Sequence, residues 1–237
     1  IEAQNIANSG WNYKSASSYI TLSFWARSSL AGTYFTQFRT VDGSEYIYYK
    51  AFTLSANTWT KVTCTIPGNS NLQFDNDNGL GLRFLIVTHY GTDYTGGGEA
   101  SSETWYSRSS QGDAYLATNF AQNWANTSSA TFDVTGVQLE RGSVATPFEM
   151  RSYGEELARC QRYYLKTGMV GTLYTAVSND NYPRISGMFP TAMRASPSSP
   201  TGNNSWNLYA NSQMYEGWKN VQSNSIGPTE MIFSAEF

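Results

Sequence analysis

An alternation of apolar and polar side chains with a period of two residues is the strongest constraint on the fold of this chain. In residues 19–27 the apolar members are Ile20, Leu22, Phe24 and Ala26. Because successive side chains of a β-strand point to opposite faces of a sheet, this run predicts a strand with one buried face. The residues expected on its other face are Tyr19, Thr21, Ser23 and Trp25.

Similar runs occupy residues 32–40, 45–54, 57–67, 79–88 and 131–140. The segments between them are rich in Gly, Asn, Asp and Ser, which favour turns. Several short strands joined by polar turns are typical of an antiparallel β-sandwich. Among sandwich topologies we expect a jelly roll.

The apolar positions change phase within the last of these runs. Phe132 and Val134 are even-numbered, Val137 and Leu139 are odd-numbered, and Gly136 lies between the two pairs. A one-residue slip moves every following side chain to the other face, so the change of phase predicts a β-bulge at the glycine.

A charged segment follows this run and has the pattern of a short helix. Ser152 and Glu155 fit a capping box at its start. The acidic Glu155 and Glu156 precede the basic Arg159 and Arg162, the order that the helix dipole favours. We therefore expect these charges to serve helix formation and solvation rather than catalysis. The apolar residues of one helix face are Tyr153, Leu157, Cys160 and Tyr164.

Alternating runs resume after the helix and continue to the last residue. We therefore predict a mainly β protein in three parts: a jelly-roll β-sandwich in residues 1–148, a short linking α-helix in 149–166 and a small C-terminal β domain in 167–237. A domain this small has a thin core, so its apolar strand faces predict association with further copies of the chain. The alternating residues of the final run are Met231, Phe233, Ala235 and Phe237.

Composition argues against two classes of partner. Charged residues make up 14% of the chain and the net charge is -3. Phosphate backbones are bound by clustered Lys and Arg, so no nucleic acid is expected. No apolar run approaches the roughly 20 residues that cross a bilayer, so no membrane insertion is expected. The chain has neither an initiator Met nor a signal peptide, which indicates a processed or partial chain.

Few residues suit catalysis. The single histidine, His89, lies at the end of an apolar run. The sequence contains no G-x-S-x-G motif that would supply a nucleophile for it, so we expect His89 to be a strand-end or interface residue. Asp93, Glu99 and Glu103 share one polar loop and include candidates for the paired carboxylates of a glycosidase. With 18 acidic residues in the chain, some such pairs are expected by chance, so this signal is weak. No enzymatic activity is predicted.

Neither the acidic turn nor the cysteines predict a cofactor. Asp75 and Asp77 alternate with asparagines but lack the spacing of an EF-hand calcium loop. We interpret this stretch as a plain turn, with a structural calcium ion as the alternative. Cys64 and Cys160 have no metal-ligand spacing and are expected to be buried, unpaired thiols, with a disulfide as the alternative. No metal and no cofactor are expected otherwise.

Aromatic residues make up 15% of the chain, more than two small cores need. Tyr and Trp rings stack on the C–H faces of sugars, while neighbouring polar groups bond the hydroxyls. Because charge is sparse, we expect stacking rather than ion pairing to supply the affinity. The alternative for each ring is a place in a core or in a subunit seam. Two candidate carbohydrate-binding clusters are Tyr90, Asp93, Tyr94, Trp105 and Tyr106, and Asn204, Trp206, Tyr209, Tyr215 and Trp218.

A resemblance to a known family lies in three stretches of the chain: VTGVQLERG, SVATPFEMRSYGEELARCQRYY and FPTAMRASPS. Together they resemble a module of tailed-bacteriophage tail fibre and receptor-binding proteins. ITLSFWARSS and AGTYFTQFRT resemble the carbohydrate-binding-module-like jelly roll of that family. The resemblance is specific between Val134 and Pro197 and looser elsewhere. It implies a homotrimer in the virion tail fibre, assembled in the cytoplasm of a bacterial host, with other tail proteins as partners.

The residues and the resemblance together predict a non-enzymatic tail fibre component that forms a homotrimer and adsorbs to a host cell-surface glycan. One alternative is a purely structural fibre segment or decoration subunit. The other is the carbohydrate-binding module of a secreted polysaccharide-degrading enzyme, which would carry a signal peptide and a catalytic domain upstream.

Overall fold

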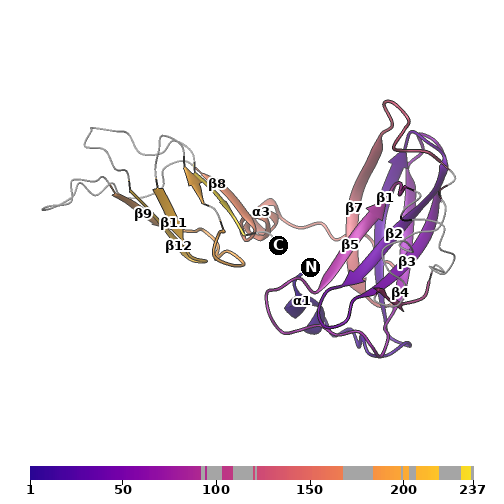
Figure 1. Cartoon of the computed structure of the whole chain (residues 1–237), viewed down its shortest axis with the longest axis horizontal. Coiled ribbons are helices and arrows are strands. Elements are labelled where there is room, and N and C mark those ends of the chain that lie inside the picture. Colours follow the sequence, from indigo (N-terminus) through magenta and orange to yellow (C-terminus); the bar gives the residue numbers. More distant parts are fainter. Residues whose placement is uncertain are drawn as a thin grey trace, which may run out of the picture. The chain divides into compact units, whose positions relative to one another are not determined.

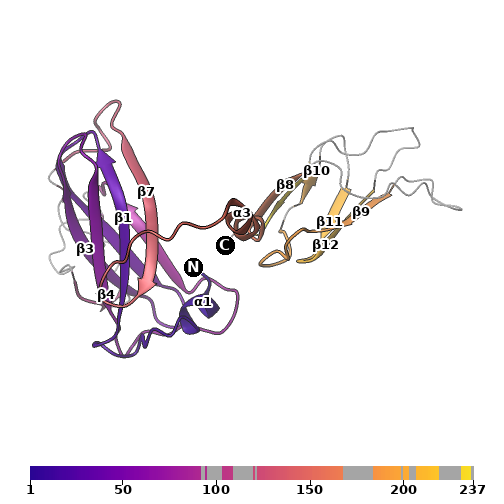
Figure 2. The same ribbon diagram turned by 180° about the vertical axis from the view of Figure 1, so that it is seen from behind.

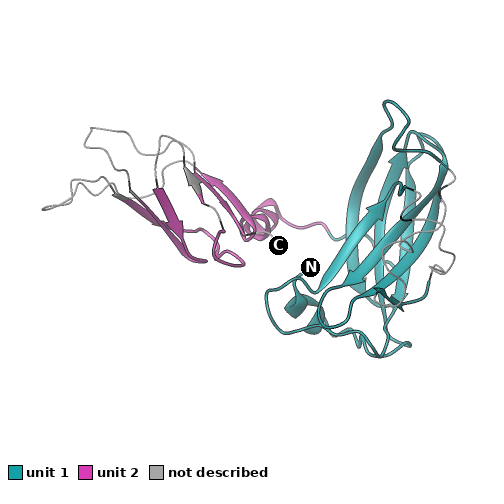
Figure 3. Cartoon of the chain, in the orientation of Figure 1, with its two compact units in different colours: residues 1–149 teal, residues 150–237 magenta. Residues whose placement is uncertain are grey.

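The computed structural model describes residues 1–91, 94, 103–108, 120, 122–167, 184–198, 200–202, 207–218 and 231–235. It is mainly β, with antiparallel sheets and short helices, which confirms the predicted fold class. The chain divides into two compact units, Ile1–Glu149 and Met150–Phe237 (Figure 3). We call them unit 1 and unit 2 and describe each by itself.

The described residues of unit 1 form a short N-terminal helix and antiparallel strands (Figure 1). Its elements are α1 (Ala3–Ala7), β1 (Tyr19–Ser28), β2 (Gly32–Thr40), β3 (Tyr46–Leu54), β4 (Thr60–Pro67), β5 (Leu82–Val87), β6 (Tyr106–Ser107) and β7 (Phe132–Arg141).

Two sheets pack face to face in unit 1 and enclose its main core. The three-stranded sheet has the order β4-β1-β7, and the four-stranded sheet has the order β5-β2-β3-β6. The strand β1 contributes the predicted apolar face, because Ile20, Leu22, Phe24 and Ala26 are all buried in this core. The arrangement is that of a β-sandwich, and the finer jelly-roll topology remains a prediction.

The outer face of the three-stranded sheet is partly covered by the chain that follows β7 (Figure 2). The Thr21 hydroxyl donates to the Gly142 carbonyl at 2.8 Å, and the Thr65 hydroxyl donates to the Ser143 carbonyl at 3.3 Å. This cover explains why Thr21 and Ser23 are buried although they do not face the core. The other two residues predicted on this face are exposed, namely Tyr19 and Trp25.

The predicted bulge in β7 is confirmed. The register of β1 and β7 shifts between the pairs Ser23↔Gln138 and Trp25↔Thr135. Gly136 lies in the shifted stretch with φ +61°, a left-handed conformation that favours glycine. The extra residue lets Phe132 and Leu139, which differ in parity, both pack against the main core.

The described residues of unit 2 form one helix and two small antiparallel sheets (Figure 1). The sheets have the orders β10-β13-β8 and β11-β12-β9. The elements are α3 (Tyr153–Gln161), β8 (Tyr164–Thr167), β9 (Arg184–Met188), β10 (Thr201–Gly202), β11 (Asn207–Ala210), β12 (Met214–Trp218) and β13 (Met231–Ser234).

The predicted helix start is confirmed in α3. The Ser152 hydroxyl accepts a hydrogen bond from the Glu155 backbone N–H at 3.3 Å, and the Glu155 carboxylate pairs with Arg159 at 3.0 Å. However, no residue of this helix is buried. Tyr153 is 82% exposed and Leu157 is 40% exposed, so the predicted apolar stripe does not pack on unit 2.

The segment predicted as a linking helix, 149–166, also contributes a strand to unit 2. The strand β8 begins at Tyr164 and pairs with β13, and Leu165 belongs to the core of the unit. The final run is not a free apolar face either. Met231, Phe233 and Ala235 are buried in the same core, and Phe237 lies outside the described residues.

Both cysteines are free, as predicted, but only one is buried. Cys64 lies in the main core of unit 1, where burial raises the pKa of its thiol. Cys160 is exposed on α3, because the face of the helix that carries it is uncovered. Among the described residues, no helix is both long and apolar enough to span a membrane.

The bulge yields the first testable prediction. Gly136→Ala should destabilise unit 1 by about 1–2 kcal/mol, because alanine disfavours the left-handed conformation. Crowding does not contribute, since the nearest atom to an added Cβ is Trp25 Cδ1 at 3.5 Å. Thermal unfolding followed by circular dichroism measures the effect. The matched control is Gly154→Ala in α3, where a Cβ meets open space and should raise helix stability. Equal stability of the two variants would contradict the role of the bulge.

Candidate functional site

The first predicted cluster is divided between the two faces of the four-stranded sheet. Trp105 is buried on the inner face, where its indole N–H donates to the Pro67 carbonyl at 2.7 Å. Its ring lies 5.3 Å from that of Tyr48, centroid to centroid. Trp105 is therefore a core residue, and its prediction as a stacking surface is corrected. Asp93 lies outside the described residues.

The three tyrosines of this cluster lie on the outer face of the sheet or beside it. Tyr90 and Tyr106 are half-buried and pack against a second cluster of buried residues, which is separate from the main core. Tyr94 is 47% exposed, and its ring centroid lies 6.0 Å from that of Tyr90. The structure therefore brings Tyr90, Tyr94 and Tyr106 to one side of the sandwich. The buried residues beneath them are Phe35, Ile47, Tyr49 and Val87.

The second predicted cluster is not assembled as expected. Tyr215 is 2% exposed and packs against the rings of Phe189 and Phe233 in the core of unit 2. Tyr209 is 61% exposed and faces the opposite side of the same sheet, because it pairs with Glu216 rather than with Tyr215. Three predictions cannot be placed. Asn204 and Trp206 lie outside the described residues, as does the side chain of Trp218.

The floor of the outer face is a set of hydrogen-bonded polar side chains that sequence reasoning missed. Gln37 is 2% exposed and donates through its amide to the Tyr49 hydroxyl. Burial raises the pKa of Tyr90, and the neighbouring amide of Gln37 lowers it in part; Tyr49 and Tyr106 also act on each other through their hydroxyls. Burial raises the pKa of Tyr49, Tyr90 and Tyr106, so all three hydroxyls stay protonated at neutral pH. We call Gln37, Tyr49, Tyr90 and Tyr106 the tyrosine cluster.

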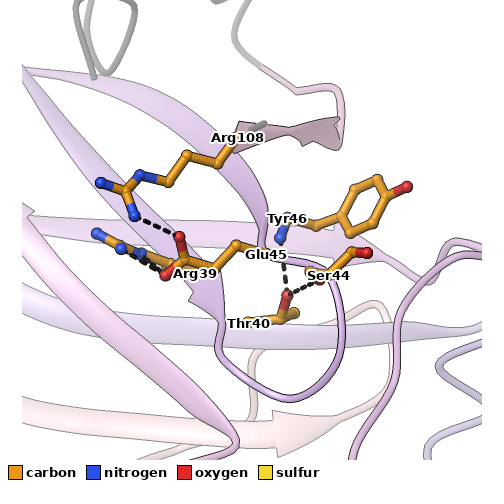
Figure 4. A network of polar contacts seen from close by, with 6 residues as sticks. All are labelled: Arg39, Thr40, Ser44, Glu45, Tyr46 and Arg108. Carbon is orange, nitrogen blue, oxygen red and sulfur yellow. Dashed lines mark hydrogen bonds and ion pairs between the residues drawn. The ribbon is translucent and has the colours of Figure 1, made fainter. Parts of the chain in front are cut away.

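An ion-pair network lies at the end of β2. The carboxylate of Glu45 accepts from Arg39 with one oxygen and from Arg108 with the other, the latter at 2.7 Å (Figure 4). The Arg108 backbone N–H also donates to the Glu45 carbonyl at 3.0 Å, which fixes the two residues together. Burial raises the pKa of Glu45, but the two guanidinium groups outweigh it and hold the pKa below the usual 4.5. Glu45 is therefore ionised at neutral pH.

The network adjoins the tyrosine cluster. Arg39 and Gln37 are two residues apart on β2, so their side chains point to the same face. The charge of Arg39 also acts on the hydroxyl of Tyr90, whose pKa it lowers against the larger effect of burial. Aromatic rings, an amide, hydroxyls and guanidinium groups thus occupy one side of one sheet. This combination can stack on a sugar ring and hydrogen-bond its hydroxyls.

The remaining candidates have local structural roles. His89 follows β5 in the chain, which confirms the prediction of a strand-end residue. Its ring centroid lies 5.6 Å from that of Phe120. Glu103 pairs with Lys50, whereas Asp93 and Glu99 lie outside the described residues.

The acidic stretch forms a turn, as predicted. Asp77 accepts from the Gly79 N–H at 2.8 Å, and the Asp75 N–H donates to Asp42 at 3.1 Å. Within the described parts of the chain, no three His, Cys, Asp or Glu side chains are arranged to hold a metal ion.

The network predicts a dependence of stability on pH. The pKa of Glu45 is lower in the folded protein than in the unfolded chain, so its ionised form stabilises the fold above the unfolded pKa. This contribution should disappear as the pH falls through the folded pKa. Glu45→Gln should therefore lower the free energy of unfolding by about 1–2 kcal/mol at pH 7. The loss should be small at a pH below both the folded and the unfolded pKa of Glu45. Denaturant unfolding at neutral and acidic pH measures the difference, and an equal cost at both would contradict the network.

Compared with known proteins, the chain matches no family model, no curated protein and no solved structure.

Proposed function

We propose that this chain is a non-enzymatic component of a virion tail fibre that forms a homotrimer and adsorbs to a host cell-surface glycan. The observation that carries the glycan-binding part is the outer face of the four-stranded sheet. There, half-buried and exposed tyrosines surround a buried and hydrogen-bonded floor. The virion setting, its assembly in the host cytoplasm and the other tail proteins as partners rest on the sequence resemblance.

The tyrosine cluster has the two chemical properties that a sugar site needs. Its floor is rigid, because Gln37 and Tyr49 are buried and bonded to each other. A ligand would therefore meet preorganised hydroxyl and amide groups, which lowers the entropy cost of binding. Towards the solvent, Tyr90 is half-buried and Tyr94 exposed, so ring surface is available for stacking.

The homotrimer is supported by apolar surface on unit 2. Met188 and Met214 are direct partners on neighbouring strands and are 77% and 37% exposed. Tyr209 lies on the same face, diagonal to Met214. The uncovered stripe of α3 adds Tyr153 and Leu157. Exposed apolar side chains that are grouped on single faces are typical of association surfaces.

One observation favours the structural alternative. Trp105 and Tyr215, which we expected to face a glycan, belong to cores, so part of the aromatic excess serves folding. A purely structural fibre segment would still form trimers but would bind no glycan.

The glycan-binding part predicts a specific loss. Tyr94→Ala should weaken binding to a host surface polysaccharide about tenfold, because a stacked ring contributes about 1–2 kcal/mol. The measurement is isothermal titration of the purified chain, with a glycan array used first to select the ligand. Tyr19→Ala serves as the control, since it removes a tyrosine that is also partly exposed but lies on the other sheet.

Three outcomes are informative. A loss with Tyr94→Ala but not with Tyr19→Ala supports the outer face as the site. An equal loss with both variants, or no loss with either, would place the binding elsewhere. Failure of the unmodified chain to bind any glycan on the array would leave the structural alternative.

The trimer makes a separate prediction. At micromolar concentration the chain should sediment as a trimer, and Met188→Lys should shift it towards monomers by placing a charge in the association surface. The control is Val144→Lys, which changes a residue in unit 1 that is 73% exposed. A monomeric unmodified chain would refute the trimer, and equal dissociation of both variants would refute the proposed surface.

A further inference from the structure

Two arginines lie directly opposite each other on the outer face of the four-stranded sheet. The antiparallel register pairs Arg39 of β2 with Arg83 of β5. The neighbouring pair, Phe38 and Phe84, faces the main core with ring centroids 5.5 Å apart. Because side chains alternate along a strand, both arginines must face outward. Directly opposed residues have Cβ atoms about 4.5–5.5 Å apart.

The positive charge of this pair is only partly compensated. Glu45 is shared between Arg39 and Arg108, so one carboxylate serves two guanidinium groups. Arg83 is exposed, and within the described parts of the chain its side chain has neither a hydrogen bond nor an ion pair. Like charges placed opposite each other on a sheet destabilise it. A bound anion would remove this repulsion.

We propose that Arg39 and Arg83 bind the carboxylate of an acidic sugar, so that the glycan bound by this face is a uronic-acid-containing or otherwise carboxylated polysaccharide. The inference deepens the proposed function and rests on it. It also revises the expectation that stacking alone supplies the affinity.

The choice of a carboxylate follows from the neighbouring network. Glu45 already shows how a carboxylate is held here, with one oxygen on each of two guanidinium groups (Figure 4). The planar guanidinium group matches the two oxygens of a carboxylate in pairs of hydrogen bonds. A second carboxylate, brought by the ligand, would meet the exposed Arg83 from the solvent side.

The position of the pair fits a sugar that also contacts the tyrosine cluster. On β2, Gln37 lies two residues before Arg39 and faces the same side of the sheet. The charge of Arg39 also lowers the pKa of the Tyr90 hydroxyl, against the larger effect of burial. A sugar ring next to Tyr90 would therefore place a carboxylate substituent within reach of the arginines. Ring contact and charge pairing then act on the same residue of the polysaccharide.

The test compares two matched polysaccharides, polygalacturonate and its fully methyl-esterified form, in which a methyl group on each carboxyl removes its charge. Isothermal titration of the full chain should show tighter binding of the charged form. Arg83→Gln should weaken polygalacturonate binding about tenfold without changing the binding of the ester. Salt should weaken only the charged form, since screening acts on charges. The control is Arg141→Gln, which removes the same charge from the other sheet.

Dextran sulfate and dextran form a second pair of probes, which distinguishes a carboxylate from a sulfate. Preference for polygalacturonate, lost in Arg83→Gln and kept in Arg141→Gln, supports the proposal. Equal binding of charged and esterified forms, an equal loss in both variants, or a preference for the sulfate would overturn it. These results leave the proposed function intact when the glycan array shows binding. Absence of binding to every glycan on the array would overturn both.

Discussion

Burial of both faces of the β2–β3 pair is the constraint on which the candidate site depends. On the inner side, Phe38 and Tyr48 belong to the core of the sandwich. On the outer side, Phe35 and Tyr49 belong to a separate buried cluster. A strand pair packed on both faces cannot shift its register without exposing apolar side chains on one of them. The positions of the amide, hydroxyl and guanidinium groups on its outer side are therefore fixed by the packing of the whole unit.

Features that depend on neighbours in the sequence could be predicted from the sequence. The apolar face of β1 follows from a period of two residues, and the bulge at Gly136 follows from a change in that period. The cap at Ser152 follows from a spacing of three residues to Glu155. In each case the signal and the structure involve the same short segment, so no knowledge of distant contacts is needed.

The candidate site depends on distant contacts, and most of it was missed for that reason. Arg39, Arg83 and Arg108 lie on different strands or beyond them, and only the strand register brings them together. Burial of the aromatic residues was misjudged for a related reason. We counted two cores, but the outer face of the four-stranded sheet forms a third apolar cluster that takes up Phe35 and Tyr49. Trp105 and Tyr106 are adjacent in the sequence, so their side chains point to opposite faces of the sheet. Trp105 is therefore buried in the main core, whereas Tyr106 lies on the outer face.

The bulge at Gly136 has a consequence for the solubility of the chain. The strand β7 ends the order β4-β1-β7, so one of its edges is free among the described strands. A regular edge ten residues long would offer an incoming strand an even row of N–H and C=O groups. The bulge breaks that row near its middle, and Asp133, Glu140 and Arg141 add charge along it. Recruitment of foreign strands into amyloid-like stacks is thereby disfavoured, which leaves side-chain surfaces as the route by which copies of the chain can meet.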